Sequence, residues 1–145
     1  MFITASKLYN FLQCSHRVWR DVYGPIEEKM EVNEFVKLLW EKGVLHEKEA
    51  IKNLGEYIDL TKGSYDERFK KTLEEMKKGT KLIYQGVIQF DNLRGIPDLL
   101  IKNDDGTYTP LDIKSGRGYE GIEEDEERFK KHYAMQLCLY LEILQ

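Results

Sequence analysis

The chain has 145 residues, of which 41% are hydrophobic and 33% charged, and its formal net charge is −4. This length suits a single domain, and the acidic balance argues against a protein whose main task is to coat nucleic acid. With two cysteines, no signal-peptide pattern and no apolar run long enough to span a membrane, the sequence excludes a disulfide framework and favours a cytoplasmic protein.

The first half of the chain is expected to be helical. Apolar residues at helical spacing predict a first helix over residues 6–24, which a Gly-Pro pair ends. A second helix is expected to start at an Asn33 cap and to reach about residue 54. A third, strongly charged helix is expected over residues 67–78, where Gly79 closes it.

The pattern changes in the second half of the chain. Apolar-rich runs over residues 82–90, 93–102 and 107–114, with short turns between them, predict a β-meander. The Gly-rich and acidic stretch over residues 115–128 is typical of a solvated loop. A last helix is expected from about residue 126 to the end.

These elements predict an α/β (α+β) fold in which helices flank a mixed β-sheet, within a single domain over residues 1–145. The last helix ends without a capping signal, so we expect the domain to be truncated or to belong to a larger protein.

Turn chemistry predicts the register of the last hairpin. A three-residue loop over residues 104–106, with its glycine in the left-handed conformation, places Asp98 opposite Asp112. A two-residue loop over residues 105–106 would shift the register and separate the two acids. In the first register Lys114 lies on the same face as the aspartates, because strand side chains repeat every two residues.

The other face of this hairpin, with Leu99, Ile101, Leu111 and Ile113, is expected to be core. Opposed carboxylates repel each other, and a cation would relieve the repulsion. Oxygen ligands of this kind suit Mg²⁺, and the backbone carbonyl of Ile113 could join them. The alternative for the neighbouring acid and lysine is an ordinary surface salt bridge.

Other candidate residues lie on helices or beside the hairpin. His46 falls on the apolar side of the second helix, where it could be a ligand or a satisfied core histidine. Pro97 interrupts an apolar run just before Asp98, which indicates a bulge or an edge strand. Gln136 and Tyr140 are four residues apart, so they share a face of the last helix and can reach one site.

Several motifs occur in an order that resembles a known family. They are G-V-L-H (43–46), G-I-P-D (95–98), L-D-I-K (111–114) and Q-L-C-L-Y (136–140), preceded by I-T-A-S-K-L-Y-N-F-L-Q-C-S-H-R-V-W from Ile3. This set resembles the PD-(D/E)xK nuclease superfamily, specifically its RecB-like branch, which includes the RecB nuclease domain and CRISPR-associated exonucleases. The resemblance covers the chain from Ile3 to Tyr140.

The resemblance implies a site and a reaction. The metal ligands would be His46, Asp98 and Asp112, and Lys114 would be the catalytic lysine. Gln136 and Tyr140 match the motif that lies near the DNA and the active site. The reaction would be Mg²⁺- or Mn²⁺-dependent hydrolysis of phosphodiester bonds in DNA, with an exonuclease acting on single strands or ends as the expected form.

The chain also departs from the family pattern. The restriction-endonuclease-like core is α-β-β-β-α-β, and the last strand is not found here, so a C-terminal segment, a partner subunit or self-association is expected to complete the sheet. Some relatives carry an iron–sulfur cluster, but only Cys14 matches a ligand position, and Cys138 is expected to be buried in the last helix. Two cysteines cannot build a four-cysteine cluster.

Local positive charge is expected around the site despite the acidic total. Arg17, Arg94 and Arg117 are candidates for phosphate contact beside Lys114, although each could also be solvated surface. A DNA nuclease is therefore the leading hypothesis. The alternatives are a catalytically inactive nucleic-acid-binding or assembly module, and a small α+β domain with no nucleic-acid role.

Overall fold

The computed structural model describes residues 1–120 and 128–145. In this described part, the helices are α1 (Ala5–Gln13), α2 (Ser15–Tyr23), the 3-10 helix η1 (Ile26–Glu28), α3 (Glu34–Lys52), α4 (Tyr65–Lys78) and α5 (Lys131–Leu144). The strands are β1 (Ile58–Asp59), β2 (Leu82–Tyr84), β3 (Ile88–Phe90), β4 (Leu93–Gly95), β5 (Leu99–Lys102), β6 (Tyr108–Leu111), β7 (Tyr119–Glu120) and β8 (Arg128–Phe129).

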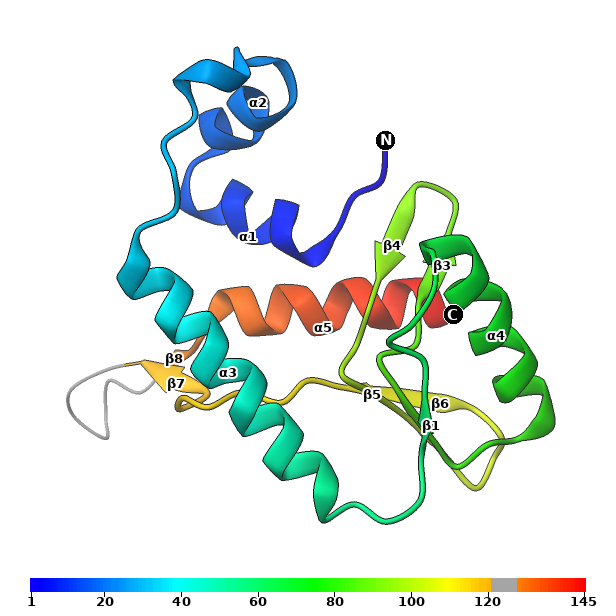
Figure 1. Ribbon diagram of the computed structural model, residues 1–145. Helices are drawn as coiled ribbons and strands as arrows, with labels where there is room; N and C mark the ends of the chain where they lie inside the picture. The colour runs from blue at the N-terminus through cyan, green and yellow to red at the C-terminus, as the bar shows by residue number, and fades with distance from the viewer. Residues whose placement is uncertain (121–127) are drawn as a thin grey trace.

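A mixed four-stranded sheet lies at the centre of the fold, in the order β1-β2-β5-β6 (Figure 1). Strand β1 is parallel to β2, and the β2–β5 and β5–β6 pairs are antiparallel. Strands β3 and β4 form a separate hairpin, as do β7 and β8. This mixed α/β arrangement confirms the predicted fold class. The edge position of β6 suits Pro110, which has no N–H to donate to a further strand.

The predicted meander is present as β2, β5 and β6, but its first two runs are each divided, and its third ends at Leu111 instead of Lys114. Gln85 has a φ of 56° and stands between β2 and β3. Pro97 is buried between β4 and β5, so it belongs to neither strand. The β3–β4 hairpin therefore leaves the sheet between β2 and β5.

The predicted first helix is wrong in one respect, because it is two helices. Cys14 is extended, with φ −166° and ψ 112°, and separates α1 from α2. The amide of Asn10 donates to Asp21 Oδ2 at 3.2 Å, which links the two helices after the break. Cys14 and Cys138 are both exposed, so the expectation that Cys138 is buried is also wrong.

The caps of the next two helices follow the predicted chemistry. The Asn33 side chain accepts a hydrogen bond from the Phe35 N–H at 2.8 Å and caps α3. Ser64 caps α4 with Glu67 in a capping box, so this helix begins two residues before the predicted start. Gly79 ends α4 at a φ of 77°.

Helix α5 begins at Lys131, after β8. Residues 121–127, which include the predicted start at about residue 126 and half of the predicted acidic loop, lie outside the described residues. Residues 128–130, predicted to be helical, are not, and Arg128–Phe129 form β8 instead. Among the residues that are described, no helix combines the length and apolar character needed to cross a membrane.

The core lies between the sheet, α4 and α5. Its buried cluster consists of Leu60, Ile83, Ile88, Leu100, Tyr108, Leu139, Tyr140 and Ile143. Leu100 and Tyr108 lie on the face predicted to be polar, whereas Leu111, predicted to be core, is 37% exposed. The expected division of faces is therefore wrong: β5 is buried on both sides, and the aspartate face packs on α5.

Candidate active site

The β5–β6 hairpin brings the two aspartates together. Asn103 N donates to Thr107 O at 2.8 Å, and Gly106 has a φ of 87°, as the three-residue loop requires. The ladder pairs Leu99 with Leu111. Its continuation by one residue sets Asp98 opposite Asp112, which is the predicted register.

Asp98 is held by the main chain and by an amide. Its Oδ2 accepts a hydrogen bond from Ile113 N at 2.7 Å, and its Oδ1 accepts one from Gln85 Nε2 at 3.0 Å. Burial and the nearby charge of Asp112 raise the pKa of Asp98 to about 7, and Glu47 adds to this effect. Without a bound cation, the charged form of Asp98 is therefore unfavourable at this position.

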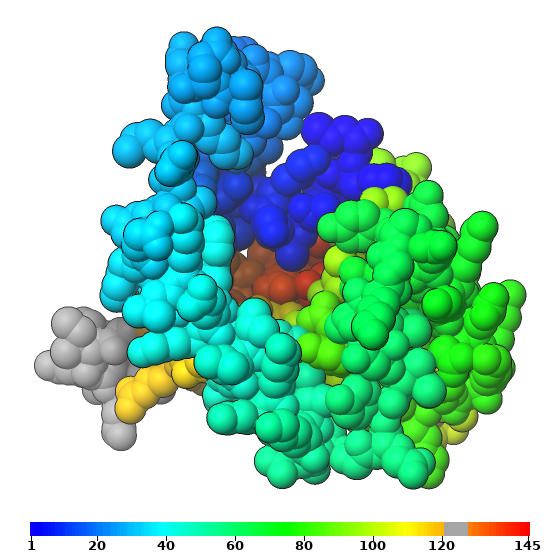
Figure 2. Space-filling view, in the orientation of Figure 1, coloured from blue at the N-terminus to red at the C-terminus, as the bar shows by residue number. Residues whose placement is uncertain are grey.

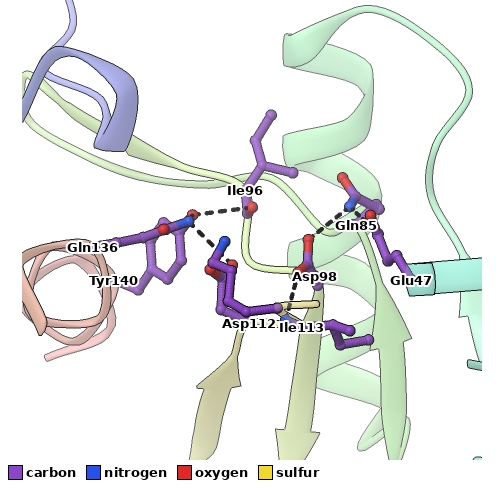
Figure 3. A network of polar contacts seen from close by, with 9 residues as sticks. Glu47, Gln85, Ile96, Asp98, Asp112, Ile113, Gln136 and Tyr140 are labelled. Carbon is purple, nitrogen blue, oxygen red and sulfur yellow. Dashed lines mark hydrogen bonds and ion pairs between the residues drawn. The ribbon is translucent and has the colours of Figure 1, made fainter. Parts of the chain in front are cut away.

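Gln85 connects this aspartate to helix α3 (Figure 3). The same Nε2 that donates to Asp98 also donates to Glu47 Oε1 at 2.7 Å. Gln85 is in the left-handed region, which is unfavourable for a residue with a side chain. Its backbone is fixed by a bond to Asp98 O at 2.9 Å and by Arg68 Nη2, which donates to Gln85 O at 2.7 Å. Surroundings that hold a strained backbone in this way are typical of functional sites.

Glu47 and Gln85 are site residues that the sequence reasoning missed. Glu47 lies on the side of α3 that also carries Val36, Gly43 and Ala50, and these positions are all partly buried. His46, one residue earlier, is exposed and makes no hydrogen bond to the site in the described part of the chain. The helical spacing alone places Glu47 on this side of α3, so the spacing is the signal that could have identified this residue.

Asp112 has different partners. Its side chain is 8% exposed and forms an ion pair with Lys114 through Oδ2. Its Oδ1 accepts a hydrogen bond from Gln136 Nε2 at 3.1 Å. The same Nε2 donates to the Tyr140 hydroxyl at 2.8 Å, and that hydroxyl donates to Ile96 O at 3.2 Å. Helix α5 is thereby tied to the segment that leads into Asp98.

Gly95 makes room for this chain of bonds. Tyr140 is 2% exposed, and burial raises the pKa of its hydroxyl. A Cβ on Gly95 would lie 2.5 and 2.7 Å from two carbons of the Tyr140 ring. The glycine of the G-I-P-D motif therefore allows the ring to lie directly against β4.

The three candidate arginines have different positions. Arg94 is on β4 and lines a cleft together with Gln136 and Tyr140. Arg17 on α2 and Arg117 after β6 are exposed. In Figure 2 a hollow opens between α1, α3 and the green segment that carries α4, and α5 is visible at its floor.

The oxygen atoms of the site suit a hard divalent cation. Within residues 1–120 and 128–145, no three His, Cys, Asp or Glu side chains form a ready metal cage. Mg²⁺ does not need such a cage, because it keeps several waters and commonly binds through one or two carboxylates. Burial and, after it, the charges of Asp112 and Glu47 raise the pKa of Asp98, and a cation beside Asp98 and Asp112 would favour the charged carboxylate again.

Comparison with known proteins gives one match. The family model of the PD-(D/E)XK nuclease superfamily matches residues 5–145. Searches of curated proteins and of solved structures each found no match.

Proposed function

The chain belongs to the PD-(D/E)XK nuclease superfamily, and we propose that it is a Mg²⁺- or Mn²⁺-dependent nuclease that hydrolyses phosphodiester bonds in DNA. One observation carries the proposal: Asp112 is paired with Lys114 and lies opposite an Asp98 whose pKa is raised to about 7. A surface salt bridge would not need a second, half-buried carboxylate opposite it.

Asp98 and Asp112 are the side chains that would hold the cation, with the Ile113 carbonyl as a further ligand. A bound divalent ion supplies charge that polarises the phosphate and lowers the pKa of a coordinated water. Lys114 would donate to the attacking water or offset the charge that develops on the scissile phosphate. Gln136 donates to Asp112 and so fixes the orientation of that carboxylate.

We assign the chain to the RecB-like branch on the order of its motifs, and we propose single strands or DNA ends as substrate. We also assign phosphate contacts to Arg17, Arg94 and Arg117, of which Arg94 lines the cleft with Gln136 and Tyr140. A cytoplasmic location follows from the same proposal. A C-terminal segment, a partner subunit or a second copy would complete the sheet at β6, which is one of its two edge strands among the described residues.

A cleavage assay tests the proposed function. Labelled single- and double-stranded DNA would be incubated with the protein in Mg²⁺, Mn²⁺ or EDTA, with Lys114→Ala as the test variant. Lys131→Ala, which changes an exposed lysine at the start of α5, is the matched control. We expect metal-dependent cleavage by the wild type and the control only, with a product ladder that separates exonuclease from endonuclease action. No cleavage by folded wild-type protein would favour a catalytically inactive binding or assembly module.

A further inference from the structure

A cleft of about 520 Å³ adjoins the carboxylates. Its walls come from the first turn of α1, from β4 and from Tyr65, and its inner end is formed by Gln136 and Tyr140. This volume lies within the range of pockets that hold a small ligand. Because Gln136 donates to Asp112, a group in the cleft would be close to the reacting part of a bound strand.

Arg94 is fixed in this cleft before any ligand arrives. Its guanidinium carbon lies 3.8 Å from the centre of the Phe2 ring and 5.0 Å from the centre of the Tyr65 ring. Its Nε and Nη2 donate to Gln89 Oε1 at 3.1 and 2.9 Å. The side chain is 16% exposed, so little of its conformational freedom remains to be lost on binding.

The segment that carries Phe2 is itself anchored to β4. Ile3 N donates to Asn92 O at 2.8 Å, and Arg94 N donates to Ile3 O at 3.0 Å. The ring therefore covers the guanidinium because the backbone holds it there. Gln89 and the two rings leave Arg94 Nη1 without a hydrogen-bond partner among the described residues. A guanidinium held in this way can present its remaining donors to a phosphate.

Charge in the cleft differs from charge in the adjacent site. Lys7 adds a second cation, and its ammonium uses one donor on Phe2 O at 2.6 Å, which leaves two of its three. None of the described residues that line the cleft is acidic. The acid nearest to Arg94 in an ion pair is Asp66, whose Oδ1 is 3.6 Å from Arg94 Nη2, but its side chain is 85% exposed and water screens it.

We propose that this cleft is a phosphate subsite, in which Arg94 and Lys7 bind one phosphate of the substrate strand beside the bond that is cut. The inference rests on the proposed nuclease function, and it names the contact that sets the position of the strand. The phosphate could be an internal phosphodiester or a terminal phosphate, since both present the same oxygens to the two cations.

Two variants test the subsite in binding. Arg94→Gln removes the guanidinium charge, and Lys71→Gln makes the same charge change at an exposed position on α4 outside the cleft. Fluorescence anisotropy in EDTA would measure the affinity of each for a labelled single strand. We expect Arg94→Gln to weaken binding about tenfold, the effect of one hydrogen bond to a charged group, and Lys71→Gln to have little effect. Equal affinities of the two variants would overturn the proposal.

A methylphosphonate scan of the strand makes the test independent of any variant's folding. Each phosphate in turn is made neutral, and wild-type cleavage in Mn²⁺ is measured. We expect a loss of about tenfold in kcat/KM at one position at a fixed distance from the cut. The same neutral phosphate should cost Arg94→Gln less than it costs the wild type, because only the Lys7 contact remains to be lost. Losses of equal size all along the strand would contradict the subsite.

The scan also identifies the source of the phosphate. Strands with a terminal phosphate or a terminal hydroxyl show whether the sensitive position is an end or an internal linkage. If the wild type does not cleave in any metal, the nuclease proposal fails while the binding comparison of Arg94→Gln with Lys71→Gln still decides the subsite. If it cleaves and the scan is flat, only the subsite fails.

Discussion

The two aspartates of the site oppose each other on one hairpin, yet they have different surroundings. The Asp98 side, defined as Asp98, Gln85 and Glu47, contains two acids bridged by a neutral amide. The Asp112 side, defined as Asp112, Lys114, Gln136 and Tyr140, contains one acid with a paired cation and a chain of hydrogen bonds from α5.

This difference separates two tasks within one site. The Asp98 side carries uncompensated negative charge, so it gains most from a bound cation. The Asp112 side is already neutralised and oriented, so it positions groups for the reaction. Both sides meet in the hairpin, where the Ile113 N–H donates to Asp98 from the residue that follows Asp112.

Removing either carboxylate is expected to have the largest effect. Asp98→Asn and Asp112→Asn should each lower metal-dependent cleavage by about 10²–10³-fold, because each removes a charge that the transition state requires. Single-turnover cleavage of labelled DNA measures the loss. If either variant kept half of the wild-type rate, the substituted carboxylate would not belong to the catalytic site.

The Asp98 side should also make the stability of the metal-free protein depend on pH. Its pKa is raised from the usual 3.8 to about 7, so the folded protein retains a proton that the unfolded chain has lost. The free energy of unfolding should therefore fall, by up to a few kcal/mol, as the pH rises from about 4 to 7, and then level off. Denaturant titrations in EDTA at several pH values measure it. Asp98→Asn should flatten this dependence, and an unchanged slope in that variant would contradict the assignment.

Two neighbouring residues of α3 provide a sharper comparison. Glu47 hydrogen-bonds to the Asp98 side through Gln85, whereas His46 is exposed. We expect Glu47→Gln to lower the cleavage rate or the metal affinity about 10- to 100-fold, the size found for groups that orient metal ligands. His46→Gln should have a smaller effect. A larger loss with His46→Gln would show that α3 turns in the active complex and would restore the histidine expected from the motif.

Crowding the Asp112 side should destabilise the protein. Gly95→Ala places a Cβ 2.5 Å from the Tyr140 ring, so the ring must move, at a cost of about 1–3 kcal/mol. Thermal unfolding measures this change. Gly116→Ala is the matched control, since among the described residues its Cβ would meet only the flexible Lys130 ammonium, at 4.0 Å. Equal stability of the two variants would mean that Tyr140 is not held against β4.

The smallest expected effect tests the hydrogen-bond chain itself. Tyr140→Phe removes the hydroxyl that joins Gln136 to Ile96 O, and it should cost about 1 kcal/mol of stability and a few-fold in rate. Because Gln136→Ala breaks the same chain, the double variant should lose less than the sum of the single losses. Additive losses would show that the two side chains act independently.

Local chemistry explains which parts of this site could be predicted from sequence. The hairpin register follows from the turn at residues 103–107, and the period of two along a strand then places Asp98, Asp112 and Lys114 on one face. The caps at Asn33 and Gly79 also depend only on neighbouring residues.

Features that depend on tertiary packing were not predictable in this way. Adjacent residues on a helix point about 100° apart, so the choice between His46 and Glu47 depends on how α3 packs. The left-handed Gln85, which divides β2 from β3, is held by contacts from Arg68 and Asp98 that lie far along the chain. Strand β1 has two residues, too few for a periodic pattern to show.

Titration calorimetry with Mn²⁺ at pH 7 tests the central claim most directly, which is that the opposed aspartates hold a divalent cation for phosphodiester hydrolysis. The account predicts binding by the wild type with release of about half a proton, because a pKa of about 7 leaves Asp98 half protonated at pH 7 and a ligand must be deprotonated. It predicts that Asp98→Asn abolishes this binding. Absence of binding by the wild type, or equal binding by Asp98→Asn, would contradict it.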